Sequence, residues 1–143
     1  MKTDHTKFAN VGDYNHDEID DHIDNVSNPH AVTLAQVNGL PGGDAYVTFA
    51  ADMTVDFSVY GSCRTSMTGN TNITLTGMVN GGRYCLMLGQ DATGSRLVSS
   101  WVTTVKWADK TAPTLTTTAW GKDIITFVQM NDIIYGAATL NFG

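Results

Sequence analysis

Residues 52–59 read Asp-Met-Thr-Val-Asp-Phe-Ser-Val, a strict alternation of polar and apolar side chains. A period of two residues is typical of a β-strand that buries one face and exposes the other. The same alternation returns in Ile-Thr-Leu at residues 73–75, just before a turn marked by Gly77. Further turn signals follow at intervals of about 8–12 residues, as in sandwiches and barrels. We therefore predict a mainly β fold, a β-sandwich or barrel, for residues 45–143.

Three of the expected strands, at 84–88, 124–128 and 133–135, are apolar on both faces. In a two-layer β protein one face of each strand should meet water. A second apolar face therefore has to be covered, and in a homo-oligomer a neighbouring subunit covers it. We place four residues of these strands at such an interface: Cys85, Met87, Ile125 and Ile134.

Charge divides the chain into two parts. The net charge is −6, and residues 1–44 carry all of it as well as all four histidines, whereas acidic and basic residues balance in residues 45–143. The linker Pro-Gly-Gly at 41–43 supports a boundary there, giving an N-terminal segment, 1–44, and a β knob, 45–143. The knob has no basic stripe, so we expect no nucleic-acid partner. The chain shows no signal peptide and no apolar run that could span a membrane, so we expect synthesis in a cytoplasm and no membrane insertion.

The N-terminal segment is expected to hold two short helices. Asn15 and Glu18 form a capping box before the first, and Asn28-Pro29 ends it. Its apolar stripe consists of Ile19, Ile23 and Val26. A second short helix follows, beginning near Thr33, with Gln36 as the capping partner. Such short helices are marginal alone, so the stripe packs either on sibling chains, which we favour, or on the β domain of its own subunit.

Two groups of residues resemble segments of tailed-bacteriophage proteins. The first is Asp21-His22-Ile23, Ser27-Asn28-Pro29-His30-Ala31-Val32-Thr33 and Gln36-Val37, which resembles a segment recurring in phage fibre and spike proteins. The second group resembles a C-terminal knob module of phage fibres, and its marks are Ile73-Thr74-Leu75-Thr76, Arg83-Tyr84, Gln90-Asp91-Ala92-Thr93-Gly94-Ser95-Arg96, Val105-Lys106-Trp107, Thr111-Ala112-Pro113-Thr114-Leu115, Asp123-Ile124-Ile125-Thr126-Phe127-Val128 and Tyr135-Gly136.

The resemblance implies a homotrimeric, jelly-roll-like knob on a virion appendage. In that interpretation the anchor and trimerisation residues are Ile19, Ile23, Val26, Asn28, Pro29, His30, Val32, Thr33 and Gln36. The protein would be a short tail fibre or spike that contacts the host surface and binds other virion proteins through its N-terminal segment. Because the chain is far shorter than a typical tail fibre, a capsid decoration protein or head fibre is the alternative.

The polar clusters of the N-terminal segment do not show the sequence pattern of a cofactor or calcium site. His30 is expected to fix the Asn-Pro-His turn by hydrogen bonds; the alternative is that it binds a metal with its symmetry mates on a trimer axis. The acids between Asp17 and Asp24 lack the calcium-loop pattern and form a solvated face, which suits docking on a basic socket. We therefore expect no cofactor and no other metal.

In the knob the sequence indicates candidate contact residues but no set of catalytic residues. We expect Trp107 in the core, and Trp101 and Trp120 in loops that contact a host glycan or protein, or else pack at the trimer interface. Cys63 and Cys85 are expected as free thiols, and no histidine of the knob is available to activate them. We therefore expect no enzymatic activity. A bacterial carbohydrate-binding module is a third interpretation, but it leaves the N-terminal segment unexplained.

Overall fold

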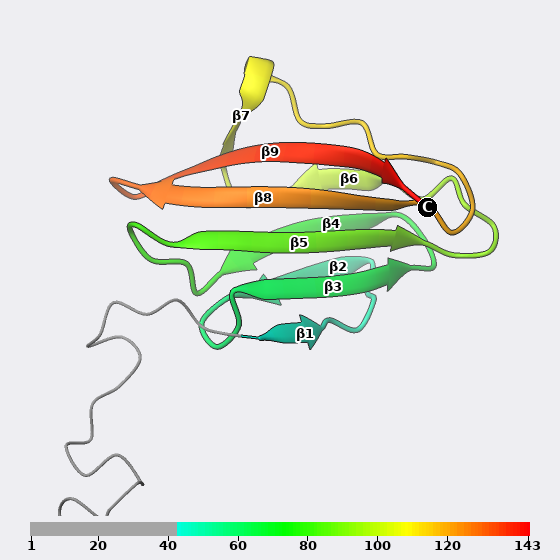
Figure 1. Ribbon diagram of the computed structural model, residues 1–143, viewed down its shortest axis with the longest axis horizontal. Coiled ribbons are helices and arrows are strands. Elements are labelled where there is room, and N and C mark those ends of the chain that lie inside the picture. Colours follow the sequence, from blue (N-terminus) through cyan, green and yellow to red (C-terminus); the bar gives the residue numbers. More distant parts are fainter. Residues whose placement is uncertain (1–42) are drawn as a thin grey trace, which may run out of the picture. The chain divides into compact units, whose positions relative to one another are not determined.

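The structure, a computed structural model, describes residues 43–143 (Figure 1). The strands are β1 (Asp44–Tyr46), β2 (Asp52–Asp56), β3 (Ser62–Met67), β4 (Thr71–Thr76), β5 (Arg83–Gln90), β6 (Val98–Trp101), β7 (Val105–Trp107), β8 (Lys122–Met130) and β9 (Ile133–Phe142). A single 3₁₀ turn of this region, η2 (Ala108–Lys110), follows β7. The two helices and the anchor residues predicted within residues 1–42 lie outside the described residues.

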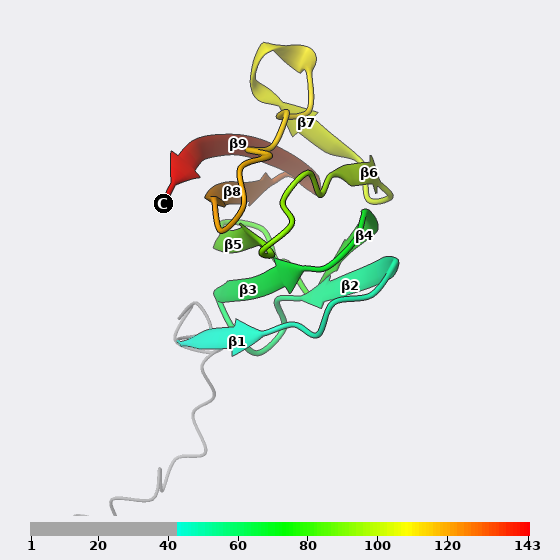
Figure 2. The ribbon, with the colours of Figure 1, turned by 90° about the vertical axis from the view of Figure 1, so that its right-hand side faces the viewer.

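Strands that alternate along the chain are neighbours in space. β1, β3 and β5 pair in parallel in one sheet, and β2, β4 and β6 pair in parallel in a second, three-stranded sheet. The chain thus crosses from one sheet to the other after each strand, and every two strands complete one coil (Figure 2). Three coils, β1–β2, β3–β4 and β5–β6, form a short β-solenoid.

This topology confirms the mainly β prediction and corrects its jelly-roll detail. A jelly roll is built from antiparallel pairs, whereas all pairs within the three coils are parallel. The period of two that predicts a strand is the same for both kinds of pairing, so the alternation in the sequence does not distinguish them. Connections that cross between two sheets make the difference, and they depend on tertiary packing.

After the third coil the larger sheet grows by an antiparallel hairpin. β8 pairs with β5 and with β9, and β9 then pairs in parallel with β7, giving the order β1-β3-β5-β8-β9-β7. Figure 2 shows β8 and β9 curving over the solenoid towards β7. The six-stranded sheet therefore bends around the end of the core instead of stopping at the third coil.

One core lies between the two sheets, and both contribute to it. Its buried apolar residues are Met53, Val55, Phe57, Cys63, Met67, Ile73, Leu75, Tyr84, Leu86, Leu88, Leu115, Ile125 and Phe127. The alternating pattern is realised over residues 52–57, where Met53, Val55 and Phe57 point inward and the residues between them are exposed, but β2 ends at Asp56 and Val59 is 62% exposed.

Aromatic rings and one loop close the core beyond the third coil; we call this region the closed end. Trp101 of β6 lies 4.9 Å from Trp107 of β7, measured between ring centroids, and both rings contact Phe127 at about 6 Å. Gly136 of β9 leaves room for the Trp107 ring, since a Cβ there would lie 2.6 Å from it. Leu115, in the loop between η2 and β8, is buried in the same core.

The opposite end of the solenoid is open. Among residues 43–143, no strand pairs with the outer edge of β1 or of β2. Side chains of the first coil, including Val47 and Phe49, pack on the core but remain only partly buried. Unpaired strand edges are surfaces on which further strands or coils add. The outer edges of β6 and β7 are likewise unpaired among the described residues, so the two ends differ in the aromatic and loop cover over the core, not in strand pairing.

Candidate functional site

The outer face of the six-stranded sheet combines apolar and polar side chains. Cys85 and Met87 of β5 and Ile124 and Val128 of β8 are half-buried there, although the core lies on the other side of the sheet. Tyr135 of β9 is 47% exposed on the same face. The outer side of the three-stranded sheet is different, because exposed Asp and Thr residues cover its β2 strand. The six-stranded sheet therefore presents the contact face of the module, and we call it the outer face.

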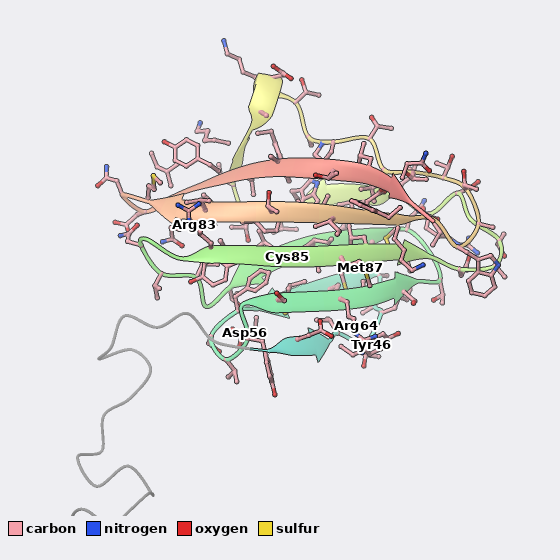
Figure 3. The ribbon with its side chains drawn as sticks, viewed as in Figure 1. Tyr46, Asp56, Arg64, Arg83, Cys85 and Met87 are labelled. Carbon is pink, nitrogen blue, oxygen red and sulfur yellow. The ribbon has the colours of Figure 1, made fainter. Side chains whose placement is uncertain are left out.

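Strand register sets the neighbours of each residue on the outer face. Cys85 pairs with Ser62 of β3 on one side and with Thr126 of β8 on the other. Met87 lies one position further along the same face, between Arg64 and Ile124. Figure 3 shows Arg83, Cys85 and Met87 in line along β5.

A hollow of about 540 Å³ opens on this face around Cys85. Its walls come from the chain entering β1, from the turn before β3, and from β5 and β8. The lining residues are Gly43, Gly61, Ser62, Arg83, Tyr84, Cys85, Thr126, Phe127 and Val128. Such a volume is in the range of small-ligand sites, which are mostly apolar with a few placed polar groups.

Arg83 supplies the charge of the hollow. Three arginines lie within residues 43–143, and two of them have carboxylate partners: Arg64 with Asp44 at 2.6 Å, and Arg96 with Asp91 at 2.9 Å. For Arg83 no hydrogen bond or ion pair with another described residue is found. Its side chain is exposed, and it pairs across the sheet with Val128, which in turn pairs with Tyr135.

The thiol at the centre of the hollow is not set up for nucleophilic chemistry. Burial raises the pKa of Cys85, and the negative charge of Asp44 raises it further. The pKa of Cys63 is raised in the same way, first by burial and then by Asp44 and Asp56. Both thiols therefore stay protonated at neutral pH, and the structure leaves them unbridged. Cys85 contributes a soft, apolar wall to the hollow.

The structure separates the four residues predicted at the subunit interface. Cys85 and Met87 lie on the outer face, where a partner can reach them. Ile125 does not, because its side chain is fully buried in the core of its own chain, and Ile124 takes its place on the outer face. Ile134 is half-buried and packs against the core. In an apolar run the sequence does not show which of two successive residues points inward.

The two tryptophans predicted to contact a host also differ. Trp101 is half-buried and packs on Trp107 and Phe127, so the prediction of a freely exposed ring needs correction. Trp107, expected in the core, packs against it. Trp120 is 67% exposed and sits in a turn with φ 64°. It remains a candidate contact residue, away from the residues that line the hollow.

Polar side chains of β5 and β8 hold the closed end together. The Gln90 side chain donates to the carbonyls of Arg96 and Thr116 and accepts from the Arg96 amide. Asp123, buried, accepts from the amide and hydroxyl of Thr116 and from the amide of Asn141. These residues fasten the loops before β6 and before β8, so their role here is structural.

The sequence predicts Arg83 only as a motif residue, and it gives no prediction of the hollow or of a contact role for this arginine. The available signal was Arg83, a cation directly before the otherwise uncharged strand residues 84–90. The hydroxyls of Ser62 and Thr126 carry no such signal, because exposed strand positions of this chain are commonly Ser or Thr. Only the register of three strands brings these groups together.

Two searches of the described part of the chain give negative results. Residues 43–143 contain no group of three or more His, Cys, Asp or Glu side chains placed to hold a metal ion. No helix in this region is long and apolar enough to cross a membrane. In comparisons with known proteins, no family model, curated protein or solved structure matches the chain.

Proposed function

We propose that this chain is a structural, non-enzymatic virion appendage protein of a tailed phage. It is a short homotrimeric tail fibre or spike whose C-terminal β module contacts the host surface. The N-terminal segment, with its Asn28-Pro29-His30 turn, anchors it to other virion proteins. This assignment starts from the resemblance of both halves of the sequence to phage fibre segments.

The observation that carries the proposal is the difference between the two ends of the solenoid. The first coil leaves strand edges unpaired among residues 43–143, at the end where the N-terminal segment joins. The other end is closed by Trp101, Trp107 and Leu115. A module whose core is covered at one end suits the tip of an appendage, because terminal units of stacked β-structures need a cap.

Trimerisation is assigned to two apolar surfaces. One is the stripe of Ile19, Ile23 and Val26 in the N-terminal segment. The other is the part of the outer face around Met87 and Ile124, which is apolar on the solvent side of a sheet. An exposed apolar face of this kind is typical of protein contact sites. Three linked copies can bind a repetitive host surface at the same time, which raises the apparent affinity by about 10²–10⁴ over that of a single weak site.

The oligomeric state tests the assembly half of the proposal. Light scattering of the full chain is expected to give close to three times the 15.4 kDa chain mass. Met87→Asp should lower this mass, since it buries a charge in the contact, and Ile23→Asp should weaken assembly through the stripe. Thr54→Asp, on the exposed side of the other sheet, is the control and should leave the mass unchanged. A folded monomer for the unmodified chain would refute the trimer.

Labelling of intact particles tests the placement. Gold-labelled antibodies raised against residues 43–143 are expected to mark the tail tip or tail spikes of a phage that encodes the chain. Labels spread over the capsid would instead identify a decoration protein or head fibre. Unlabelled particles would refute a virion role altogether.

A further inference from the structure

We propose that the hollow on the outer face binds a carboxylate-bearing sugar residue of a surface polysaccharide, with Arg83 as the carboxylate-binding group. This inference rests on the proposed host contact and names its chemistry. Polysaccharides rich in acidic sugars present such residues repeatedly, which suits a trimeric protein.

The charge argument begins with the guanidinium of Arg83. Within the described residues, Arg83 is the arginine without a carboxylate partner, and it borders the hollow. An arginine matches a carboxylate in shape as well as charge, through two parallel hydrogen bonds. Residues 45–143 have as many acids as bases. Anion binding would therefore be local to this site and not a property of the whole surface.

The rest of the hollow suits a sugar ring. Ser62 and Thr126 place hydroxyls on either side of Cys85, where they can exchange hydrogen bonds with ring hydroxyls. The Thr126 hydroxyl makes only a long bond of 3.4 Å, to the carbonyl of Ala137. Cys85 and Val128 give an apolar wall for the C–H face of the ring. Gly43, with φ 96°, and Gly61 add no side chains to the rim.

A carboxylate fits better than a phosphate. A phosphomonoester brings a charge of about −1.5 to −2 at pH 7, and among the lining residues Arg83 is the sole cation. Lys122, the exposed cation of the neighbouring strand β8, lies at the opposite end of that strand from Val128 and does not line the hollow. One guanidinium therefore balances one carboxylate and leaves a phosphate partly uncompensated.

The test uses the full chain and three acidic probes: tetramers of galacturonate, of hyaluronate and of α2,8-linked sialic acid. Titration calorimetry and amide chemical shifts are expected to show binding of at least one probe, with shifts centred on Ser62, Cys85 and Thr126. The methyl ester of the bound tetramer, which keeps the rings and loses the charge, should bind at least about tenfold more weakly.

Matched variants separate a specific site from general attraction. Arg83→Gln should weaken binding of the same probe at least about tenfold, as expected for loss of a charged hydrogen bond. Lys122→Gln makes the same change in net charge on the same strand pair and should stay within about twofold. Urea unfolding of both variants checks that each is folded, since both side chains are exposed.

The other outcomes overturn the inference. Equal losses in the two variants would show diffuse electrostatics, and tighter binding of glucose 1-phosphate would identify a phosphate site. Absence of binding by all three tetramers would remove the sugar site. None of these results affects particle labelling or the trimer mass, so the inference can fail while the proposed appendage stands.

Discussion

The first coil and the closed end of the module differ in the contacts that cover the core and hold each end in place. At the closed end, the rings of Trp101, Trp107 and Phe127 cover the core, and buried side-chain hydrogen bonds fasten the covering loop. The first coil buries Met53 and Val55 of β2 in the core, and its other contacts are strand pairing and a few exposed polar bonds, such as Asn72 to Asp52 at 2.8 Å. Its apolar residue Phe49 is only half-buried.

From this difference we infer which end contributes more to the unfolding free energy of the module. Buried, fully bonded polar groups and aromatic packing are costly to disturb, whereas exposed pairs contribute little. The closed end should therefore be the most stable part. The first coil is the part that another strand or coil can still stabilise by pairing with its edges.

The largest expected effect is at Asp123. Asp123→Ala removes three hydrogen bonds to a buried carboxylate and frees the loop around Thr116, at a cost of about 3–5 kcal/mol in unfolding free energy. Asp52→Ala, the matched carboxylate of the first coil, should cost less than about 1 kcal/mol because its bond to Asn72 is exposed. Urea unfolding monitored by circular dichroism measures both. Equal costs would refute the difference between the ends.

Aromatic truncation should give the next largest effect. Trp107→Leu leaves a gap beside Trp101 and Phe127 and beside the glycine at 136, and is expected to cost about 2–3 kcal/mol. Phe49→Leu in the first coil should cost about 1 kcal/mol, because solvent already reaches its ring. Thermal unfolding of the two variants compares the ends directly. A larger loss at Phe49 would show that the first coil carries more of the core than its burial indicates.

How far the sequence predicts this molecule depends on which force decides each feature. The alternation of residues 52–59 predicts a half-buried strand, and the apolar content of 84–88 and 124–128 predicts apolar side chains on both faces. Both predictions are possible because buried positions require apolar residues, and the local sequence shows where these are. Parallel coiling leaves no such mark, since the same strands suit either direction of pairing. Motif residues such as Gln90 were recognisable, but their bonds to a loop beyond residue 110 were not.

The candidate site shows the same limit more strongly. Met87 was predicted on a contact face because a doubly apolar strand demands a cover. Arg83, Ser62 and Thr126 come from three strands, and each taken singly resembles any solvent-exposed strand residue. Their proximity is a product of register, which long-range pairing determines. The site could therefore be predicted only as an apolar face, without its charge.

Acid should weaken both ends, and the closed end more. Hydrogen bonds from Arg96 above all hold the pKa of Asp91 below its ordinary value of 3.8, and the Ser58 amide above all lowers that of Asp56. A lowered pKa means that the stabilisation is present above pH 3.8 and is lost as pH falls through the lowered value. The difference in unfolding free energy between the unmodified chain and Asp91→Asn should therefore become smaller as the pH falls.

The same measurement distinguishes the ends. Urea midpoints between pH 7 and pH 3 should show a larger pH-dependent loss relative to Asp91→Asn than relative to Asp56→Asn, because only Asp91 also pairs with a cation. Added salt should reduce the Asp91 difference and leave that of Asp56 nearly unchanged. Identical pH and salt responses would mean that the Arg96 pair adds nothing to the loop.

The smallest effect is expected at the edge of the first coil. Asp44 of β1 pairs with Arg64 of β3 at 2.6 Å, but both side chains are about half exposed. Asp44→Asn should therefore change the unfolding free energy by less than about 1 kcal/mol.

If the edge of β1 pairs with a further strand in the assembled particle, the same substitution should also leave that pairing intact, since backbone groups and not the carboxylate would make it. Amide hydrogen exchange of Ala45 and Tyr46 in the trimer and in a dissociated variant measures this. Protection that is equal in both states would show that the first coil remains open after assembly.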